Sequence, residues 1–265
     1  MALFNLFERE NLYLPGCFSE AYLDYTIRNY ERIMKKLGIR FRKFSDNFCC
    51  SALLEEAGYE KQVRKIAKDN LQILNEKGVI RIITSCPNCF RMLSQNYKEM
   101  MPNWDIKVDF ILQPIFEVLK NTKNLSDYFN EPIAYYDSCY LSRYLSFYET
   151  PREILKLFGF NVVELQRNHE ETLCCGSCGL LPITNPELSK KIAREFITDL
   201  KRQKIKKIVT ADQLAYKHLR DNLKKEDNIE LLEFSEILCD SLGIKKEKPE
   251  AKEDKEKEEN GDDKK

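Results

Sequence analysis

Cysteine is the residue type in this chain that points most directly to chemistry. Ten of the 265 residues are cysteines, and half of these lie in the amino-terminal part of the chain. A single cysteine comes first, a vicinal pair follows after 31 residues, and a Cys-Pro-Asn-Cys segment follows after 35 more. The five residues are Cys17, Cys49, Cys50, Cys86 and Cys89.

Such a set of thiols is typical of a metal or redox site. A structural zinc ion takes four ligands, usually from paired and spaced cysteines. Adjacent cysteines such as Cys49 and Cys50 aim their side chains apart, which suits the separate irons of a cluster held from several places. Pro87 favours the first position of a helix, so we expect Cys86 and Cys89 near a helix N-terminus, where thiol pKa values are lowered. We interpret the set as an iron–sulfur site, with zinc and reactive or packed thiols as alternatives.

The second half begins with the same spacing and then departs from it. Cys139 is followed after 34 residues by Cys174 and Cys175, but the segment that should match Cys-Pro-Asn-Cys begins with Asp212 and lacks cysteine. An additional thiol, Cys178, follows the pair instead. Three interpretations stay open: a remodelled cluster with Cys178 or Asp212 as a substitute ligand, a zinc site, or a metal-free thiol pair. Asp212 also opens a predicted helix, where it is expected to act as the N-cap.

The elements that would position these residues form an internal repeat. Each half contains, in order, a strand, a cysteine, a helix, a glycine, a strand, a vicinal cysteine pair, a helix and a strand. Strands that alternate with helices predict crossover connections and parallel sheets. We therefore expect an α/β fold of two βαβ-type halves with mainly parallel sheets, divided into residues 1–128 and 129–244.

The predicted strands place the cysteines at one edge of each sheet. These strands are the short apolar runs at 12–14, 81–84, 133–136 and 207–210. Cys17, Cys86 and Cys139 each fall just after one of them, and ligands gather at the carboxyl ends of parallel strands. Gly38 and Gly159 each follow a predicted helix, where a residue with positive φ is expected. We therefore predict cluster sites at the carboxyl edges of the strands.

Two kinds of segment complete the predicted architecture. Residues 109–119 and 231–242 predict matching terminal helices. Residues 245–265 contain 8 Lys and 9 Asp or Glu among 21 positions, without an aromatic or large aliphatic side chain. Such a segment buries too little apolar surface to offset its conformational entropy, so we predict a disordered charged tail.

Composition and charge exclude several classes of protein. The 43 basic and 43 acidic residues cancel, which is not the pattern of a dedicated nucleic-acid-binding protein. No apolar run approaches the ~18–20 residues that span a bilayer. The first residues lack the features of a signal peptide, so we expect a cytoplasmic protein. Clustered cysteines under reducing conditions indicate metal or redox chemistry rather than disulfides.

The complete motif of the first half, Cys17-x31-Cys49-Cys50-x35-Cys86-x2-Cys89, resembles that of the cysteine-rich CCG domain family. The family includes the cysteine-rich subunit of heterodisulfide reductase, iron–sulfur subunits of glycolate and lactate oxidation systems, and the extra subunit of some succinate dehydrogenases. The resemblance covers about residues 10–242. It implies that these cysteines ligate a [4Fe-4S] cluster, non-cubane in the heterodisulfide reductase branch, although the spacing does not distinguish the two cluster types. A second cluster would use Cys139, Cys174, Cys175, Cys178 and Asp212.

Several neighbouring residues are assessed against the same family. Ser51 stands where the family has glycine, which we expect to be tolerated if the backbone keeps a common conformation. Asp137 and Arg143 match family positions, and Arg143 is predicted either to face a cluster or substrate carboxylate or to form a structural ion pair. Tyr136 and Tyr140 replace histidines found in related proteins. Cys178 and Arg143 are the candidates for a direct part in catalysis.

Three further residues have simpler interpretations. His169 is predicted to be an exposed loop histidine, with proton donation as the alternative. His218 lies on a basic predicted helix and is given no role. Cys239 has the spacing of a core residue and is predicted to be a packed, inert thiol.

The leading functional hypothesis is an iron–sulfur redox protein resembling the cysteine-rich subunit of heterodisulfide reductase. It would receive electrons from a partner and reduce a disulfide-type substrate or pass the electrons on. The sequence has neither a GxGxxG fingerprint nor a ferredoxin-type cysteine run, so a ferredoxin-like iron–sulfur protein and a flavoprotein are the expected partners in a complex. The alternatives are a pure electron-transfer component of a 2-hydroxy acid or succinate oxidising complex that feeds quinone, and a zinc-stabilised scaffold without redox activity.

Overall fold

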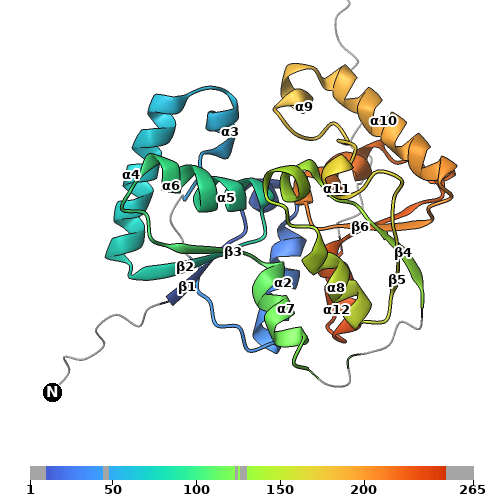
Figure 1. The fold of residues 1–265 in the computed structure, drawn as a ribbon, viewed down its shortest axis with the longest axis horizontal. Coiled ribbons are helices and arrows are strands. Elements are labelled where there is room, and N and C mark those ends of the chain that lie inside the picture. The colour runs from blue at the N-terminus through green and yellow to red at the C-terminus, as the bar shows by residue number, and fades with distance from the viewer. Residues whose placement is uncertain (1–9, 44–47, 123–124, 126–129, 249–265) are drawn as a thin grey trace, which may run out of the picture.

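The computed structural model describes residues 10–43, 48–122, 125 and 130–248, which form two α/β halves side by side (Figure 1). The first half has a parallel sheet in the order β1-β2-β3. Its strands are β1 (Glu10–Leu14), β2 (Val79–Thr84) and β3 (Lys107–Phe110). Its helical elements are α1 (Cys17–Tyr22), α2 (Asp24–Lys36), α3 (Ala52–Glu56), α4 (Glu60–Glu76), α5 (Pro87–Arg91), the π-helical turn η1 (Met92–Asn96), α6 (Tyr97–Met100) and α7 (Leu112–Leu119).

The second half has a parallel sheet in the order β5-β4-β6-β7. Its strands are β4 (Pro132–Tyr135), β5 (Asn161–Val163), β6 (Lys207–Thr210) and β7 (Glu230–Glu233). Its helical elements are η2 (Tyr140–Tyr144), α8 (Glu149–Leu157), η3 (His169–Glu171), α9 (Leu181–Thr184), α10 (Pro186–Arg202), α11 (Gln213–Asn222), η4 (Lys225–Asp227) and α12 (Phe234–Ser241). The predicted α/β class with repeated, parallel halves is confirmed.

The strand after the glycine differs between the halves. Gly38 and Gly159 both have the predicted positive φ, 71° and 82°. In the second half the chain then forms β5 beside β4. In the first half, the described residues up to 43 make an isolated parallel bridge between Leu12 and Arg42 and no further strand pairing. The edge strand predicted there is therefore reduced to one bridge.

The predicted terminal helices are wrong at their first residues, because each segment starts as a strand. Asp109 pairs with Ile83 in the first sheet, and Leu231 pairs with Ile208 in the second. Short apolar runs fit a buried strand as well as a helix, so the period alone could not separate the two. The helices α7 and α12 begin only after β3 and β7 end.

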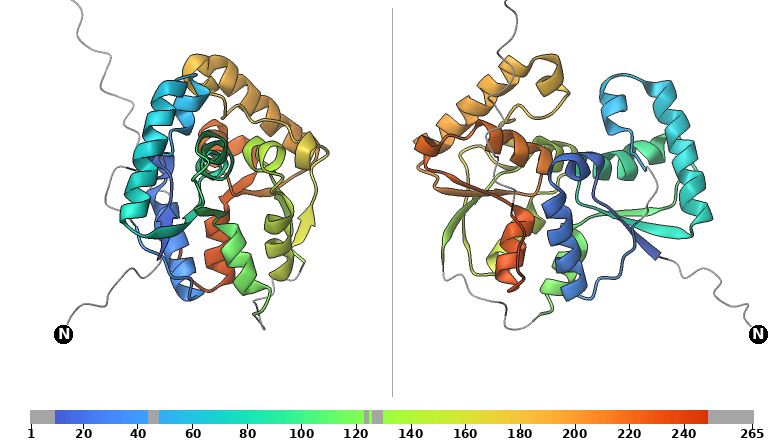
Figure 2. Two further views of the ribbon diagram at one scale, coloured as in Figure 1. Left: turned by 60° about the vertical axis from the view of Figure 1, so that its left-hand side comes forward. Right: turned by 180° about the vertical axis from the view of Figure 1, so that it is seen from behind.

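One hydrophobic core joins the halves. The helices α2, α7, α8 and α12 lie together between the two sheets (Figures 1 and 2), with α2 against α12 and α7 against α8. Ile33, Ile115, Ile154 and Ile237, one from each helix, belong to the same buried cluster. This shared core fixes how the two halves face each other. The predicted division between residues 128 and 129 lies outside the described residues and stays a prediction.

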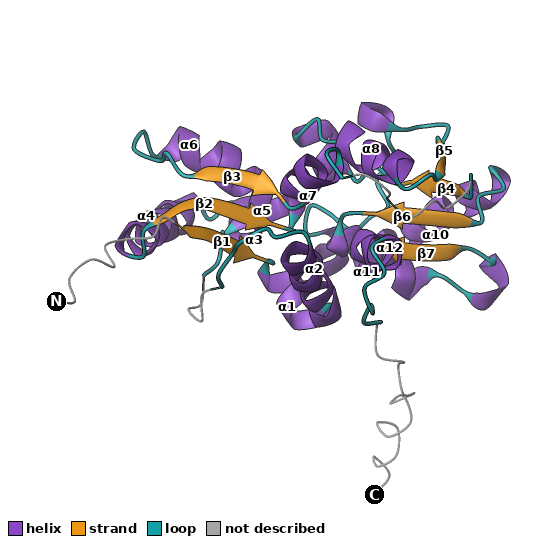
Figure 3. Ribbon diagram, turned by 90° about the horizontal axis from the view of Figure 1, so that it is seen from below, coloured by secondary structure: helices purple, strands orange, loops and turns teal. Residues whose placement is uncertain are grey.

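The carboxyl edges of the two sheets face the middle of the molecule. Figure 3 shows the sheets end to end, with helices between them. Helix α5 follows β2 and contacts η2, which follows β4, while α1 contacts α11 across the same boundary. Elements that follow strands of different halves therefore meet at the centre. Within the described segments, every helix is too short or too polar to cross a lipid bilayer.

The start of the predicted tail contacts helix α2 through Glu247 and Lys245. The backbone N–H of Glu247 donates to Oδ1 of Asn29 at 2.8 Å, and Nδ2 of Asn29 donates to the carbonyl of Glu247 at 3.1 Å. The Glu247 carboxylate also pairs with Arg28 and Arg32. Residues 249–265, the rest of the predicted tail, lie outside the described residues.

These contacts predict different results for two truncations. A chain that ends at residue 244 loses the Asn29 and arginine contacts, and its free energy of unfolding should fall by about 1–2 kcal/mol, the sum of two or three net hydrogen bonds. A chain that ends at residue 248 keeps them and should match the full chain. Urea unfolding of the three proteins measures the difference. Equal stability of the two truncations would show that the Glu247 contacts do not contribute.

Candidate functional site

The five cysteines of the first half lie at the carboxyl edge of their sheet, where their thiols contact one another in pairs. Cys17 starts α1 directly after β1, the vicinal pair precedes α3, and Cys86 is the N-cap of α5, which contains Cys89. The sulfurs of Cys50 and Cys89 are 3.1 Å apart, and the thiol of Cys17 interacts with that of Cys49. Cys50 and Cys89 are buried, whereas Cys17 and Cys49 are exposed. The set, which we call the first thiol site, is therefore open to solvent on one side.

A glycine makes the close approach of β1 to the Cys-Pro-Asn-Cys segment feasible. Gly16 has a φ of 92°, and a Cβ added there would lie 2.6 Å from the Cβ of Cys86 and 3.6 Å from the sulfur of Cys89. Any larger residue would push the two strands' ends apart. Gly16 is thus part of the first thiol site, although nothing in the sequence alone singled it out.

The residue after each vicinal cysteine pair points its backbone N–H at a sulfur. Ser51 has a φ of 62° and its N–H lies 3.4 Å from the sulfur of Cys49. Gly176 has a φ of 90° and its N–H lies 3.3 Å from the sulfur of Cys174. The condition set for Ser51, a common backbone conformation, is therefore not met. A positive φ at this residue directs its backbone N–H at the sulfur of the first cysteine of the pair. Glycine suits the position because it adopts a positive φ without steric cost.

Replacement of Gly176 by alanine should destabilise the second half strongly. A Cβ at Gly176 would lie 2.7 Å from the carbonyl oxygen of Ser189, in addition to the strain of a positive φ. We expect the free energy of unfolding to fall by about 2–4 kcal/mol. Gly179 is the matched control, because its φ is also positive, 66°, but its Cβ would meet nothing within 4 Å. Gly179→Ala should cost about 1 kcal/mol, and equal losses in urea unfolding would contradict the steric argument.

The first thiol site favours thiolates at two of its cysteines. The pKa of Cys86 is lowered by the neighbouring thiol of Cys89 and by backbone N–H groups at the start of α5. The pKa of Cys49 is lowered to about 6 by the thiol of Cys17 and by the N–H of Ser51. The lowered pKa predicted from Pro87 therefore has the expected direction at Cys86, but the prediction is wrong at Cys89, whose pKa is raised by the thiols of Cys50 and Cys86 and by burial. Thiolates are the form in which cysteine binds metal.

Two side chains far away in the sequence hold the vicinal pair. Asn70 of α4 donates from Nδ2 to the carbonyl of Cys49 at 2.8 Å and to the hydroxyl of Tyr97 at 2.9 Å. The Tyr97 hydroxyl donates to the carbonyl of Cys50 at 3.3 Å. Both side chains are buried, so they position the pair rather than react. Asn70 and Tyr97 lie far from the vicinal pair along the chain, so no local sequence pattern predicts this role.

In the second half, three of the predicted residues come together. The sulfurs of Cys139, Cys174 and Cys178 all lie within 4.8 Å of one another. The Cys178 sulfur is 3.2 Å from each of the other two. The sulfur of Cys175 is buried away from this set and contacts the hydroxyl of Ser177 at 3.4 Å. We call the three cysteines the second thiol site.

Asp212 caps helix α11. Its carboxylate accepts hydrogen bonds from the N–H groups of Leu214 and Ala215 at 2.9 and 3.2 Å. The side chain is buried, and burial raises the pKa of the carboxyl. Asp212 thus occupies the helix N-cap that Cys86 occupies in the first half. The N-cap role predicted from the sequence is confirmed, while a role in ligation stays untested.

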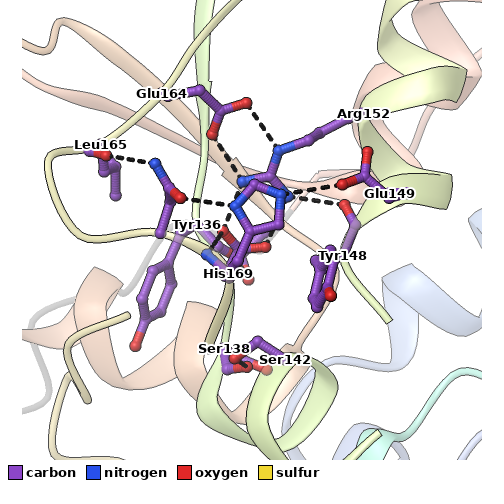
Figure 4. A network of polar contacts seen from close by, with 12 residues as sticks. Tyr136, Ser138, Ser142, Tyr148, Glu149, Arg152, Glu164, Leu165 and His169 are labelled. Carbon is purple, nitrogen blue, oxygen red and sulfur yellow. Dashed lines mark hydrogen bonds and ion pairs between the residues drawn. The ribbon is translucent and has the colours of Figure 1, made fainter. Parts of the chain in front are cut away.

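A buried ion-pair network of the second half is centred on Arg152 (Figure 4) and includes Asp137, two residues before Cys139. The guanidinium of Arg152 donates to both carboxylate oxygens of Asp137, at 2.8 and 2.6 Å, and to both of Glu164, at 2.8 and 2.7 Å. The Asp137 carboxylate also accepts from the N–H of His169 at 2.9 Å. Arg152 of α8 therefore binds both the segment before Cys139 and Glu164, the residue after β5, while Asp137 binds the loop that leads to the vicinal pair.

The side chains of Arg143 and His169 lie outside the Asp137–Arg152 ion pair and have partners of their own. Arg143 lies on the surface and donates to the carbonyl of Thr172 at 2.9 Å, so it is not the ion-pair partner of Asp137. His169 packs against the ring of Tyr148 and pairs through Nε2 with Glu149 at 3.0 Å. His169 begins the turn η3 and is partly buried against these partners, so the prediction of an exposed loop histidine is wrong.

The remaining predicted residues have structural contacts. The hydroxyl of Tyr136 donates to the carbonyl of Leu173 at 3.0 Å and accepts from the N–H of Cys175 at 3.1 Å, so this tyrosine positions the pair. Tyr140 is buried and packs against Tyr144. Cys239 is fully buried in α12, as predicted. His218, which was given no role, contacts Ser189 through Nε2 at 3.3 Å, and burial lowers its pKa.

Fold and site together define a class of protein: a repeated parallel α/β chain that gathers cysteines where the carboxyl edges of its two sheets face each other. The family model described as a cysteine-rich domain, CCG, matches residues 11–94 and 133–220, one stretch in each half. The chain belongs to this CCG family. The matched stretches contain both thiol sites.

Two curated relatives extend the comparison over most of the chain. The first is one of the subunits of the dihydromethanophenazine:CoB–CoM heterodisulfide reductase of Methanosarcina barkeri, 24% identical over 246 residues, or 88% of this chain and 59% of that protein. The second is lactate utilization protein A 2 of Bacillus cereus, 23% identical over 237 residues, or 85% of this chain and 96% of that protein. The chain thus spans 59% of the length of the Methanosarcina reductase chain.

A solved structure shares the fold. A hypothetical protein from Helicobacter pylori aligns with a TM-score of 0.64 at 12% sequence identity, and the alignment covers 89% of this chain and 49% of that one. At this identity the likeness concerns the arrangement of the elements alone.

Proposed function

We propose that this protein is an iron–sulfur redox subunit that receives electrons from a partner protein and reduces a disulfide-type substrate. The observation that carries the proposal is the first thiol site. Five cysteines from three separate segments reach one sheet edge, with two of them exposed and two buried. Clusters need several thiolates from several places, and this arrangement supplies them.

The residues of the first thiol site fit a [4Fe-4S] cluster. Cys17, Cys49, Cys50, Cys86 and Cys89 would hold it, and when bound it supplies one-electron transfer. Five thiols for four irons leave room for a non-cubane arrangement. The close approach at Gly16 keeps β1 beside α5, and the N–H of Ser51 stabilises negative charge on the sulfur of Cys49. The exposed side at Cys17 and Cys49 is where a donor protein can approach.

The disulfide substrate and the partners rest on similarity. The reductase of Methanosarcina barkeri is named for a heterodisulfide, and its matched chain aligns with 88% of this one. As expected from the sequence analysis, the proposed setting is a complex with a ferredoxin-like iron–sulfur protein and a flavoprotein in the cytoplasm. A membrane contact, if the complex has one, would come through the partners.

A second candidate function is electron transfer without chemistry on a substrate. The lactate utilization protein of Bacillus cereus matches this chain over 96% of its own length. On this alternative the chain passes electrons from the oxidation of a 2-hydroxy acid or succinate towards quinone. A zinc-stabilised scaffold is the remaining alternative, and it requires neither iron nor electron transfer.

The two redox functions differ in a disulfide assay. The anaerobically purified protein is mixed with a reduced viologen and a disulfide, and released thiol is measured with viologen oxidation. A reductase should release two thiols for each pair of electrons, and Cys86→Ser should abolish turnover. Viologen oxidation by a quinone analogue without thiol release would show an electron-transfer protein instead. Colourless protein that contains only zinc would contradict both.

A further inference from the structure

We infer that Cys174 and Cys178 of the second thiol site are a redox-active dithiol, at which an anionic disulfide of low molecular mass is cleaved. The electrons that restore the dithiol come from the proposed function, so the inference rests on it for turnover. The first cleavage of a disulfide is independent of the proposed function, because it needs only the reduced thiols.

The positions of the sulfurs suit exchange with a disulfide. The sulfurs of Cys174 and Cys178 are 3.2 Å apart, so a small movement would join them at the ~2.05 Å of a disulfide bond. Both side chains are partly exposed, whereas Cys139 is buried on their inner side, with its sulfur 3.2 Å from that of Cys178. A substrate can therefore reach Cys174 and Cys178 from solvent.

The backbone identifies Cys174 as the attacking residue. The N–H of Gly176 lies 3.3 Å from its sulfur and stabilises the thiolate, which is the nucleophile in thiol–disulfide exchange. Gly176 is held in this orientation because the hydroxyl of Ser189 donates to its carbonyl at 2.8 Å. Cys178, the nearest thiol that is also partly exposed, is the resolving residue.

Among the described residues, the groups that could complete a four-ligand metal centre are engaged elsewhere. The Asp212 carboxylate accepts two N–H groups of α11, and the Cys175 sulfur faces Ser177. The Nε2 of His218 contacts Ser189. A structural zinc site takes four protein ligands, and only three thiols converge here. The arrangement therefore favours exchange chemistry over a closed metal site.

A nearby cation indicates the charge of the substrate. Arg143 of η2 lies on the surface and reaches the carbonyl of Thr172, two residues before Cys174, at 2.9 Å. A guanidinium in this position can bind a carboxylate or phosphate group of a substrate whose sulfur meets Cys174. The substrate class is therefore a disulfide that carries such groups.

The proposed reaction balances in two exchange steps. The Cys174 thiolate attacks one sulfur of the substrate R–S–S–R′, so that the mixed disulfide Cys174–S–S–R forms and R′S⁻ leaves and takes up a proton. Cys178 then loses its proton and attacks the Cys174 sulfur, which releases RS⁻ and forms a Cys174–Cys178 disulfide. The substrate has gained two electrons and the dithiol has lost two. Two electrons and two protons, with the electrons from a reduced iron–sulfur or flavin donor, restore the thiols.

The mixed disulfide can be trapped on a chain that lacks both other thiols of the site. Cys139→Ser/Cys178→Ser protein is treated with glutathione disulfide under anaerobic conditions, and its peptides are analysed by mass spectrometry. We expect one glutathione per chain on Cys174, and none on this segment in Cys174→Ser. In the wild-type protein we expect a Cys174–Cys178 link and two released glutathione molecules. Circular dichroism checks that each variant folds.

Other outcomes would overturn the inference or the proposed function separately. Adducts confined to Cys17 or Cys49, or a metal ion retained by the three thiols of untreated protein, would overturn the inference. So would a Cys174→Ser chain that keeps its iron and reduces the disulfide with reduced viologen at the wild-type rate, which leaves the proposed function standing. A Cys174 adduct on a chain that binds no iron supports the dithiol and contradicts the proposed function.

Discussion

Cys50→Ser protein is expected to bind far less iron than the wild type after anaerobic purification. Cys50 is buried, and its sulfur is 3.1 Å from that of Cys89, at the inner side of the first thiol site. Serine replaces a soft thiolate by a hydroxyl that binds iron poorly. Mutation of residues that only hydrogen-bond to metal ligands already lowers metal affinity about 10–100-fold. We therefore expect the loss of a ligand itself to lower the iron content at least about tenfold. Cys86→Ser should behave in the same way.

Cys239→Ser is the matched control for this experiment. It makes the same chemical change at another buried cysteine, but Cys239 lies in the core of α12. Iron and acid-labile sulfide per chain are measured on all the proteins, with circular dichroism to check folding. The control should keep the wild-type iron content. Wild-type iron in Cys50→Ser, or an equal loss in Cys239→Ser, would remove the first thiol site as the cluster ligand set.

Arg152→Met should lower the free energy of unfolding by about 3–5 kcal/mol. Arg152 and Asp137 are each 1% exposed, so the variant leaves the Asp137 carboxylate buried without its main partner. Removing one member of a buried ion pair costs this much because the remaining charge stays desolvated. Glu164 is 41% exposed at its side chain and can be hydrated, so Asp137 accounts for most of the loss.

An exposed arginine provides the comparison for Arg152. Arg167 pairs with Glu171 at 3.6 Å, with side chains that are 56% and 83% exposed. Arg167→Met should therefore change the free energy of unfolding by less than about 1 kcal/mol. Urea denaturation of both variants measures the difference. A loss in Arg152→Met as small as that in Arg167→Met would show that the network in Figure 4 does not hold the second half together.

The sequence predicted the positions of the sites because local patterns determine them. Each strand before a cysteine is a short apolar run, and parallel strands must end at a common edge. The N-cap at Asp212 and the helix start at Pro87 also follow from the residue type at one position. The cysteines of the first half could therefore be placed together from their spacing and their order along the repeat.

What the sequence missed depends on contacts between distant segments. Arg152 pairs with Asp137 across 15 residues, and Asn70 reaches the carbonyl of Cys49 across 21, so no local pattern announces either contact. The left-handed backbone at Ser51 was missed because serine seldom adopts it. The strands β3 and β7 were taken into the helices that follow them, because such short segments are too brief to show a period.

Metal analysis of the wild-type protein tests the central claim most directly. The protein is purified without oxygen, and its iron, zinc and acid-labile sulfide per chain are determined together with its absorption and electron paramagnetic resonance spectra. The account predicts a brown protein with at least about four irons and four sulfides per chain, as a [4Fe-4S] cluster requires. Colourless protein with zinc in place of iron would contradict it.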